Sequence, residues 1–140
     1  MSCELCETPG GELLWQDDRC RVVLVSDPDY PGYCRVIWRD HVKEMTDLPD
    51  ASRQHLMEVV FGTEQALRQC LAPDKVNLAS FGNLTPHLHW HVIPRYRDDR
   101  HFPNPIWGLP MRETDTAWQG DVTQELRDTL HTVLGQIKRT

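Results

Sequence analysis

The chain has 140 residues, of which 39% are hydrophobic and 26% charged, and its formal net charge is −6. This length and composition are typical of one folded domain whose core needs no metal or disulfide. The acidic balance argues against nucleic-acid binding, which usually requires a basic face. The acidic net charge does not exclude binding of a small phosphorylated ligand, because such a ligand needs only a local positive pocket.

Three strands are predicted in the first part of the chain. Residues 12–15 and 21–26 flank a polar turn, and the second segment is rich in β-branched residues. After a loop with two prolines and a glycine, residues 33–39 alternate between an apolar face and a face that carries Arg35. His41 follows just past the end of this third strand.

A long helix is predicted next. Asp47 offers an N-terminal cap, and Pro49 falls in the first turn. Apolar residues at three- and four-residue spacing then form one stripe that continues to about Leu71. Pro73 ends the helix, because proline cannot continue the backbone hydrogen bonding.

Two further strands are predicted at residues 75–81 and 87–94, on either side of the turn 82–86. Beyond them, residues 96–120 carry several prolines and are expected to be irregular.

The last predicted element is a helix over residues 121–138, which begins at a capping box formed by Asp121 and Gln124. The order of strands, helix, strands and helix predicts an α+β fold with a mainly antiparallel sheet. We expect a single domain over residues 1–140, with its core at about residues 12–95.

The N-terminal residues show no basic start followed by an apolar stretch, so we expect no secretory signal. The longest aliphatic run, residues 22–25, is far too short to cross a bilayer. Five cysteines form an odd set without the spacing of a disulfide framework, which favours reduced thiols or metal ligands. These features predict a cytoplasmic protein without a membrane partner.

Three histidines alternate along the segment 87–94, namely His87, His89 and His91, with apolar residues between them. In a strand, this spacing directs all three imidazoles from one face into a common volume. Imidazole can serve as nucleophile, acid or base near neutral pH, and attack on phosphorus would give an intermediate that water can hydrolyse. The alternative is a surface strand or an adventitious metal patch.

The run from His87 to Ile93 resembles the His-φ-His-φ-His-φ-φ signature of the histidine triad (HIT) family, in which φ is an apolar residue. The resemblance extends to His41, to Asn77 ten residues before the triad, and to the ending Ile93-Pro94-Arg95. It implies a five-stranded, mainly antiparallel sheet flanked by two helices, and a homodimer.

The resemblance also implies roles for the histidines. His89 would be the nucleophile and His91 would contact phosphate oxygens or assist the leaving group, while His87 and His41 would orient the site and supply positive character. A histidine at the last triad position favours a hydrolase over the related uridylyltransferases, which carry glutamine there. Family substrates include dinucleoside polyphosphates, nucleoside phosphoramidates and adenylated amines.

By the same resemblance, Asn77 would lie near the phosphate or ribose. Where many relatives have a glutamine and a small hydroxyl residue before the triad, this chain has Asn83 and Thr85 as the matching candidates for substrate binding. We expect the chemistry at the α-phosphate to proceed through a nucleotidyl-histidine, with no cofactor required. A non-catalytic nucleotide sensor is the alternative, and a metal-dependent hydrolase fits less well because the His-x-His pair lacks the further ligands such sites need.

Cys3 and Cys6 have the spacing of half a tetrahedral zinc site. Some HIT relatives bind zinc through such a pair together with the early histidine and the first triad histidine. Transferred to this chain, the ligands of a structural zinc ion would be Cys3, Cys6, His41 and His87. The alternative is two exposed thiols on a frayed terminus.

Two further features follow the triad. Arg95, Arg97 and Arg100 could face a phosphate, but the aspartates between them favour a solvated loop of mixed charge. Trp107, in the proline-rich segment, could stack on a nucleobase or pack against a partner subunit.

Overall fold

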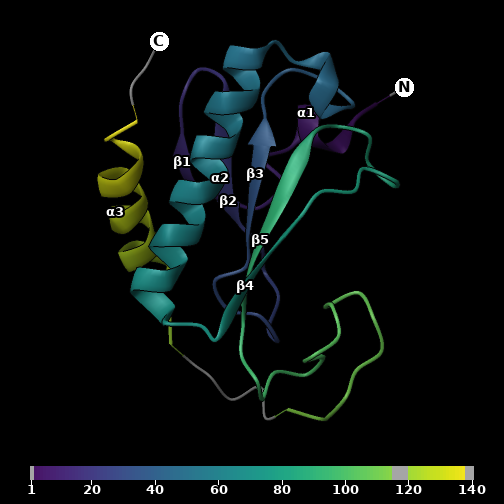
Figure 1. The fold of residues 1–140 in the computed structure, drawn as a ribbon, viewed down its shortest axis with the longest axis vertical. Coiled ribbons are helices and arrows are strands. Elements are labelled where there is room, and N and C mark those ends of the chain that lie inside the picture. The colour runs from purple at the N-terminus through teal and green to yellow at the C-terminus, as the bar shows by residue number, and fades with distance from the viewer. Residues whose placement is uncertain (1, 115–119, 138–140) are drawn as a thin grey trace.

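The computed structural model describes residues 2–114 and 120–137 and contains one five-stranded antiparallel sheet with the strand order β1-β2-β3-β5-β4 (Figure 1). The strands are β1 (Glu12–Gln16), β2 (Cys20–Leu24), β3 (Cys34–Trp38), β4 (Lys75–Ala79) and β5 (His89–Arg95). This arrangement confirms the predicted α+β class and the sheet that the family resemblance implies.

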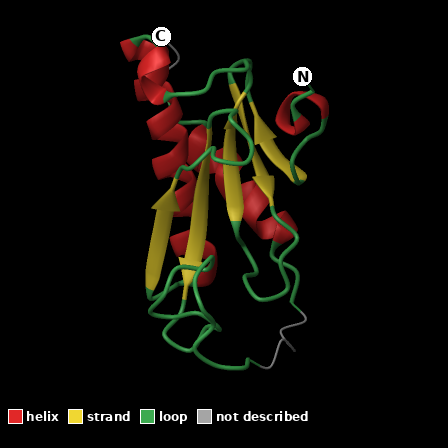
Figure 2. Cartoon of the chain, turned by 90° about the vertical axis from the view of Figure 1, so that its right-hand side faces the viewer, coloured by secondary structure: helices red, strands yellow, loops and turns green. Residues whose placement is uncertain are grey.

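The helices of the described residues are α1 (Glu4–Glu7), the 3-10 helix η1 (Met45–Asp47), α2 (Asp50–Leu71) and α3 (Thr123–Leu134). Helices α2 and α3 pack together beside one face of the sheet, and Figure 2 shows α1 set apart from them. None of these helices is long and apolar enough to span a membrane.

The main core lies between the sheet and the α2–α3 layer. The predicted stripe of α2 supplies much of it, together with α3 and the core-facing residues of β1, β2, β3 and β5. Burial of such apolar side chains contributes about 1.5–3 kcal/mol each. Its fully buried members include Leu56, Val59, Val60, Leu67, Leu126, Leu130, Val36 and Val92.

A second, small cluster lies on the opposite face of the sheet. Leu5 of α1 packs there against Val23 and Ile37, which fixes the N-terminal helix on the same face as the odd-numbered residues of β5. The N-terminal segment is therefore held next to the histidines rather than frayed.

Both predicted helix starts are wrong in detail. Helix α2 begins after Pro49, while Asp47 instead closes η1 and accepts the N–H of Glu44 at 3.2 Å. Helix α3 begins at Thr123, and its predicted capping box is absent, because Gln124 bonds to the carboxylate of Asp128. In each case the expected capping side chain bonds elsewhere: Asp47 bonds back to the N–H of Glu44, and Gln124 bonds forward to Asp128.

The triad strand also differs from its prediction. Strand β5 begins at His89 and not at residue 87, since the N–H of His87 is turned back to the carbonyl of Thr85 at 2.8 Å. The strand before it ends at Ala79 instead of residue 81. His87 therefore precedes the strand and need not follow its alternation.

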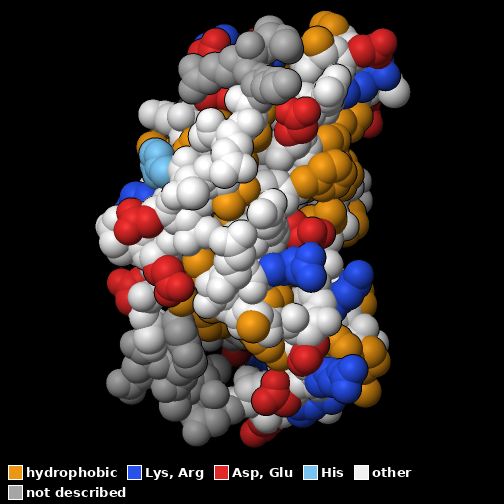
Figure 3. Space-filling view, turned by 60° about the vertical axis from the view of Figure 1, so that its left-hand side comes forward, with side chains coloured by type: hydrophobic (Ala, Val, Ile, Leu, Met, Phe, Trp, Pro, Cys, Tyr) orange, Lys and Arg blue, Asp and Glu red, His pale blue; other side chains and the backbone are white. Residues whose placement is uncertain are grey.

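The segment at residues 96–114 is irregular as predicted. Residues 115–119 of the predicted irregular segment and residue 138 of the predicted final helix lie outside the described residues. Over the side of the molecule around α3, acidic and basic side chains are interspersed rather than gathered in one basic patch (Figure 3).

Candidate active site and metal centre

A cavity of about 360 Å³ lies on the histidine face of the sheet. It is lined by Glu4, Leu5, Arg35, Phe81, Gly82, Asn83, Leu84, Thr85, His89, His91 and Trp107. Alternation along β5 brings His89 and His91 into it, with their ring centroids 5.1 Å apart. His87 does not line this cavity, so the expectation of one common volume is wrong for that residue.

His89 is held by the backbone just before it. Its Nδ1 lies 2.6 Å from the carbonyl oxygen of His87, and the side chain is buried. A carbonyl only accepts hydrogen bonds, so Nδ1 carries the proton and Nε2 keeps its lone pair. The unprotonated nitrogen is the one left for the cavity, which is what a nucleophile requires.

His91 is held by Tyr33, whose hydroxyl lies 2.6 Å from Nδ1 of the ring. Burial lowers the pKa of His91 to about 4, assisted by the charges of His89 and Arg35. Burial also raises the pKa of Tyr33, although the neighbouring Arg35 opposes this. Both groups are therefore neutral at pH 7.

Neutrality determines how the proton is placed on His91. A phenol can donate or accept, but its one O–H hydrogen needs an acceptor when it is buried, and Nδ1 of His91 is the acceptor that the described residues give it. Donation from Tyr33 to Nδ1 is therefore the arrangement that leaves no buried hydroxyl hydrogen unpaired. The ring proton is then on Nε2, and His91 offers an N–H donor to the cavity. His89 thus presents the lone pair of its Nε2 to the cavity, and His91 presents an N–H donor.

Tyr33 and Arg35 were not among the predicted site residues. Tyr33 directly precedes β3 and Arg35 lies within it, where the Cα of Arg35 pairs with that of His91 in the sheet register. The one available signal was the alternation at residues 33–39, which places Arg35 opposite the core face. Nothing in the sequence shows which strand lies next to that face.

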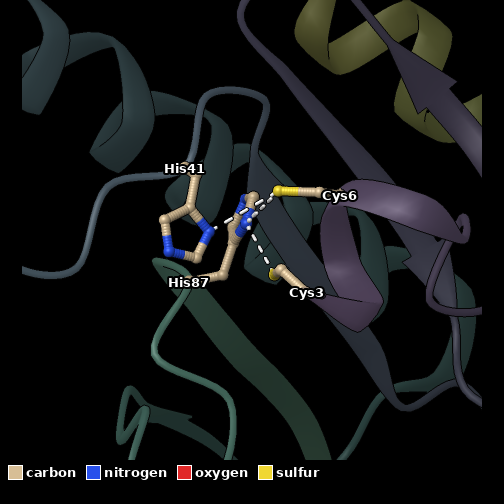
Figure 4. A group of neighbouring side chains, drawn as sticks. All are labelled: Cys3, Cys6, His41 and His87. Atoms are coloured by element: carbon tan, nitrogen blue, oxygen red, sulfur yellow. Dashed lines mark hydrogen bonds between the residues drawn. The ribbon is translucent and has the colours of Figure 1, made fainter. Parts of the chain in front are cut away.

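His87 and three residues from elsewhere form a second cluster beside the cavity (Figure 4). His87 is fully buried, and its Nε2 donates to the carbonyl of Trp38 at 2.5 Å. Its Nδ1 faces the sulfur atoms of Cys3 and Cys6 at 3.4 Å each. His41 completes the group, with Nδ1 3.5 Å from the sulfur of Cys6.

The donor atoms of this cluster fit a tetrahedral zinc ion. The four atoms lie within 4.8 Å of one another. Zinc bonds to sulfur at about 2.3 Å and to nitrogen at about 2.0–2.1 Å, so tetrahedral geometry separates nitrogen and sulfur ligands by about 3.5 Å. The distances in the cluster match this spacing. Burial lowers the pKa of His87, which keeps its Nδ1 lone pair available as a ligand.

The predicted substrate-binding residues are divided by the fold. Asn83 and Thr85 line the cavity. Asn77 does not line it: its position in β4 pairs with Ile93, and its side-chain oxygen accepts a hydrogen bond from Arg95 at 2.7 Å.

Arg95 is buried and pairs with Asp99, at 2.7 Å between nitrogen and oxygen. It therefore belongs neither to a phosphate-facing patch nor to a solvated loop. Trp107 lies at the cavity with half of its surface exposed, its ring centroid 4.9 Å from that of His91 and 4.9 Å from that of Phe81. Two aromatic rings consequently form one wall beside His91.

Comparison with known proteins gives consistent results. A model of the HIT domain matches residues 10–98. The AP-4-A phosphorylase of Mycobacterium tuberculosis is 29% identical over 113 residues, which cover 76% of this chain and 53% of that protein, so this chain spans about half of that relative.

Solved structures show the same fold. A histidine triad protein from Marinobacter aquaeolei superimposes with a TM-score of 0.73 at 26% identity, covering 99% of this chain and 98% of the other. A Zn-bound histidine triad family protein from Mycobacterium smegmatis gives a TM-score of 0.60 at 23% identity, covering 97% of this chain and 95% of the other.

Proposed function

The chain belongs to the HIT family, and from this membership we propose that it is a nucleotide hydrolase acting at the α-phosphate of a nucleoside polyphosphate or phosphoramidate. The observation that carries the proposal is the hydrogen bond from Nδ1 of His89 to the carbonyl of His87, which leaves Nε2 free to attack phosphorus. The similarity to a mycobacterial AP-4-A phosphorylase supports a nucleotide substrate.

In the first step, Nε2 of His89 forms a bond to the α-phosphorus, and the bond to the leaving group breaks with its electron pair. A polyphosphate oxygen leaves as the anion, whereas a leaving nitrogen takes up a proton from solvent and departs as the neutral amine or ammonia. The N–H of His91 hydrogen-bonds to a phosphate oxygen or to the leaving atom as negative charge develops there. Asn83 and Thr85 offer further polar groups at the same cavity.

In the second step, water adds to phosphorus, the bond to His89 breaks, and the nucleoside monophosphate leaves while a proton passes to solvent. The histidine returns to its starting state. This route needs no cofactor at the reacting atoms, because the nitrogen lone pair is already available.

We further propose that Cys3, Cys6, His41 and His87 hold a structural zinc ion, since all four positions of a tetrahedral site would be filled by protein atoms. Such an ion would tie α1 to the start of β5 and fix His87, whose carbonyl orients the nucleophile. His41 and His87 would then be positioning residues: they would hold the site in place and would not contact the substrate. The Zn-bound relative supports this assignment.

The decisive experiment is hydrolysis of diadenosine tetraphosphate, adenosine phosphoramidate and adenylated lysine by the parent and by His89→Ala. We expect the variant to lose activity by several orders of magnitude. Rapid quenching of the parent in alkali should trap a nucleotide on His89, because the P–N bond of a nucleotidyl-histidine survives alkali and is hydrolysed by acid. Binding of adenosine nucleotides without turnover would instead favour the sensor, our second candidate.

Cytoplasmic location, a homodimer and a single domain over residues 1–140 complete the proposal. Light scattering after size exclusion tests the dimer, and a monomer at working concentration would contradict it.

A further inference from the structure

Arg35 lines the histidine cavity, and no acidic residue in the described part of the chain pairs with its guanidinium. Arg35 projects from β3 on the same face as His91 and lines the cavity with it. Glu4 also lines the cavity, but it does not approach Arg35 to within ion-pair distance, and Arg35 forms no salt bridge with any residue in the ranges 2–114 and 120–137.

The hydrogen bonding of Arg35 is also incomplete. Its Nη1 donates to the carbonyl of Gly10 at a long 3.2 Å, whereas its Nε is buried and has no partner in the described part of the chain. A buried donor left unpaired costs about 1–3 kcal/mol. Because Nε is closed to solvent, an anion in the cavity would meet the outer N–H groups of the guanidinium, whose planar fork matches phosphate oxygens.

The surroundings hold Arg35 in place. Gly10 has a φ of +80°, a left-handed conformation that favours glycine, and a Cβ there would lie 2.9 Å from Ile37 and Leu5. The Arg35 guanidinium carbon also lies 5.9 Å from the ring centroid of Tyr33, within cation–π range. The guanidinium is thus fixed at the wall of the cavity, where no carboxylate of residues 2–114 or 120–137 neutralises its charge.

In the proposed reaction, both cavity histidines act at the scissile phosphate: His89 attacks with its lone pair, and His91 donates a hydrogen bond. Arg35 stands next to His91, the residue on which the leaving atom depends. A leaving group that carries further phosphates brings negative charge to this place, whereas a released amine or ammonia brings none. Arg–phosphate contacts are charge-assisted and stronger than neutral hydrogen bonds.

We propose that Arg35 is a specificity-determining residue that binds the anionic leaving group, so that the enzyme prefers nucleoside polyphosphates over phosphoramidates. This inference rests on the proposed hydrolysis at the same site. Arg35 would contact the leaving phosphates of a nucleoside polyphosphate and would have no such contact with a phosphoramidate.

The test compares two substrates with the same nucleoside and α-phosphate, diadenosine tetraphosphate and adenosine phosphoramidate. Arg35→Gln should lower kcat/KM about 10- to 100-fold for the first substrate, and less than about fivefold for the second. Arg35→Lys keeps the charge and should fall between parent and Arg35→Gln. Arg39→Gln, an exposed position after the same strand, is the matched control and should change neither substrate.

Equal losses on both substrates would overturn the inference, because Arg35 would then bind the scissile phosphate that they share. No loss on either, or a parental preference for the phosphoramidate, would also overturn it. Thermal unfolding of each variant separates loss of fold from loss of contact. If Arg35→Gln fails to fold, the parent and Arg35→Lys carry the comparison.

Failure of the proposed hydrolysis has a different signature, namely that the parent turns over neither substrate. In that event, binding of inorganic tripolyphosphate by the parent and by Arg35→Gln decides the matter. At least tenfold weaker binding by the variant supports the anion site, and equal affinity overturns it.

Discussion

The hydroxyl of Tyr33 lies 2.6 Å from Nδ1 of His91, a contact between buried residues 58 positions apart in the sequence. It determines which nitrogen of His91 carries the proton and therefore what His91 offers to the cavity.

Tyr33→Phe removes this donor while keeping the ring. We expect kcat to fall about 10- to 100-fold with little change in KM, because a free His91 ring can turn or change tautomer while the cavity still binds substrate. Steady-state kinetics give the split, and nitrogen NMR of His91 reports the tautomer. Tyr96→Phe is the control, since its hydroxyl bonds to the carbonyl of Leu71 and not to a histidine. An equal loss in the control would contradict the prediction.

Acid should destabilise the protein through His91. Burial, followed by the charges of His89 and Arg35, lowers its folded pKa to about 4, whereas the unfolded value is near 6.5. Between these values the unfolded chain binds more protons, so the contribution of His91 is complete above about pH 6.5 and declines as pH falls toward 4.

Denaturant unfolding at several pH values checks this. His87 acts in the same direction, because burial lowers its pKa too, so the comparison with His91→Gln isolates one group. The variant should show a shallower fall in the free energy of unfolding between pH 6.5 and 4. Identical slopes in parent and variant would rule out this role of His91.

Removal of the proposed zinc ion should destabilise the folded protein, because the ion would join Cys3 and Cys6 to His41 and His87. A ligand present at 100 times its Kd stabilises the folded state by about 2.7 kcal/mol, so chelation should lower Tm and Cys6→Ser should do the same. Metal analysis of protein purified without added zinc should give about one ion per chain in the parent. Cys70→Ser is the control, as a half-buried thiol outside the cluster. Equal zinc in parent and Cys6→Ser would contradict the assignment.

Asp17 and His55 form a buried pair, with 2.7 Å between Oδ2 and Nε2. The other carboxylate oxygen of Asp17 accepts the N–H groups of Arg19 and Cys20 at 2.8 Å each. Burial opposes ionisation, yet these bonds lower the pKa of Asp17 overall. The pair therefore ties the β1–β2 turn to α2.

Asp17→Asn should reduce the free energy of unfolding by about 1–3 kcal/mol, since charge-assisted hydrogen bonds are lost in a buried place. Catalysis should persist in the folded fraction, because neither residue lines the histidine cavity. Asp18→Asn, the exposed neighbour, should leave stability unchanged. Chemical denaturation of the three proteins gives the comparison, and equal stability of Asp17→Asn and the parent would refute the prediction.

Much of this protein is determined by local patterns in the sequence. Alternation and apolar spacing predicted the strands and the α2 stripe, because burial of one face has the period of the element that carries it. The same alternation predicted that His89 and His91 share a face, and the family pattern grouped Cys3, Cys6, His41 and His87. Helix starts were predicted less well, since several polar residues nearby compete for the same backbone groups.

Tertiary structure decided the rest, because the deciding contacts join residues far apart in the chain. His87 leaves the alternation since its two nitrogens are bound by Trp38 on one side and the cysteines on the other. Arg35 reaches the cavity, and Tyr33 reaches His91, because β3 pairs with β5, a neighbour relation that no local pattern encodes. A sequence can show which side chains share one face of a strand, but the packing of the strands determines which residues of other strands contact them.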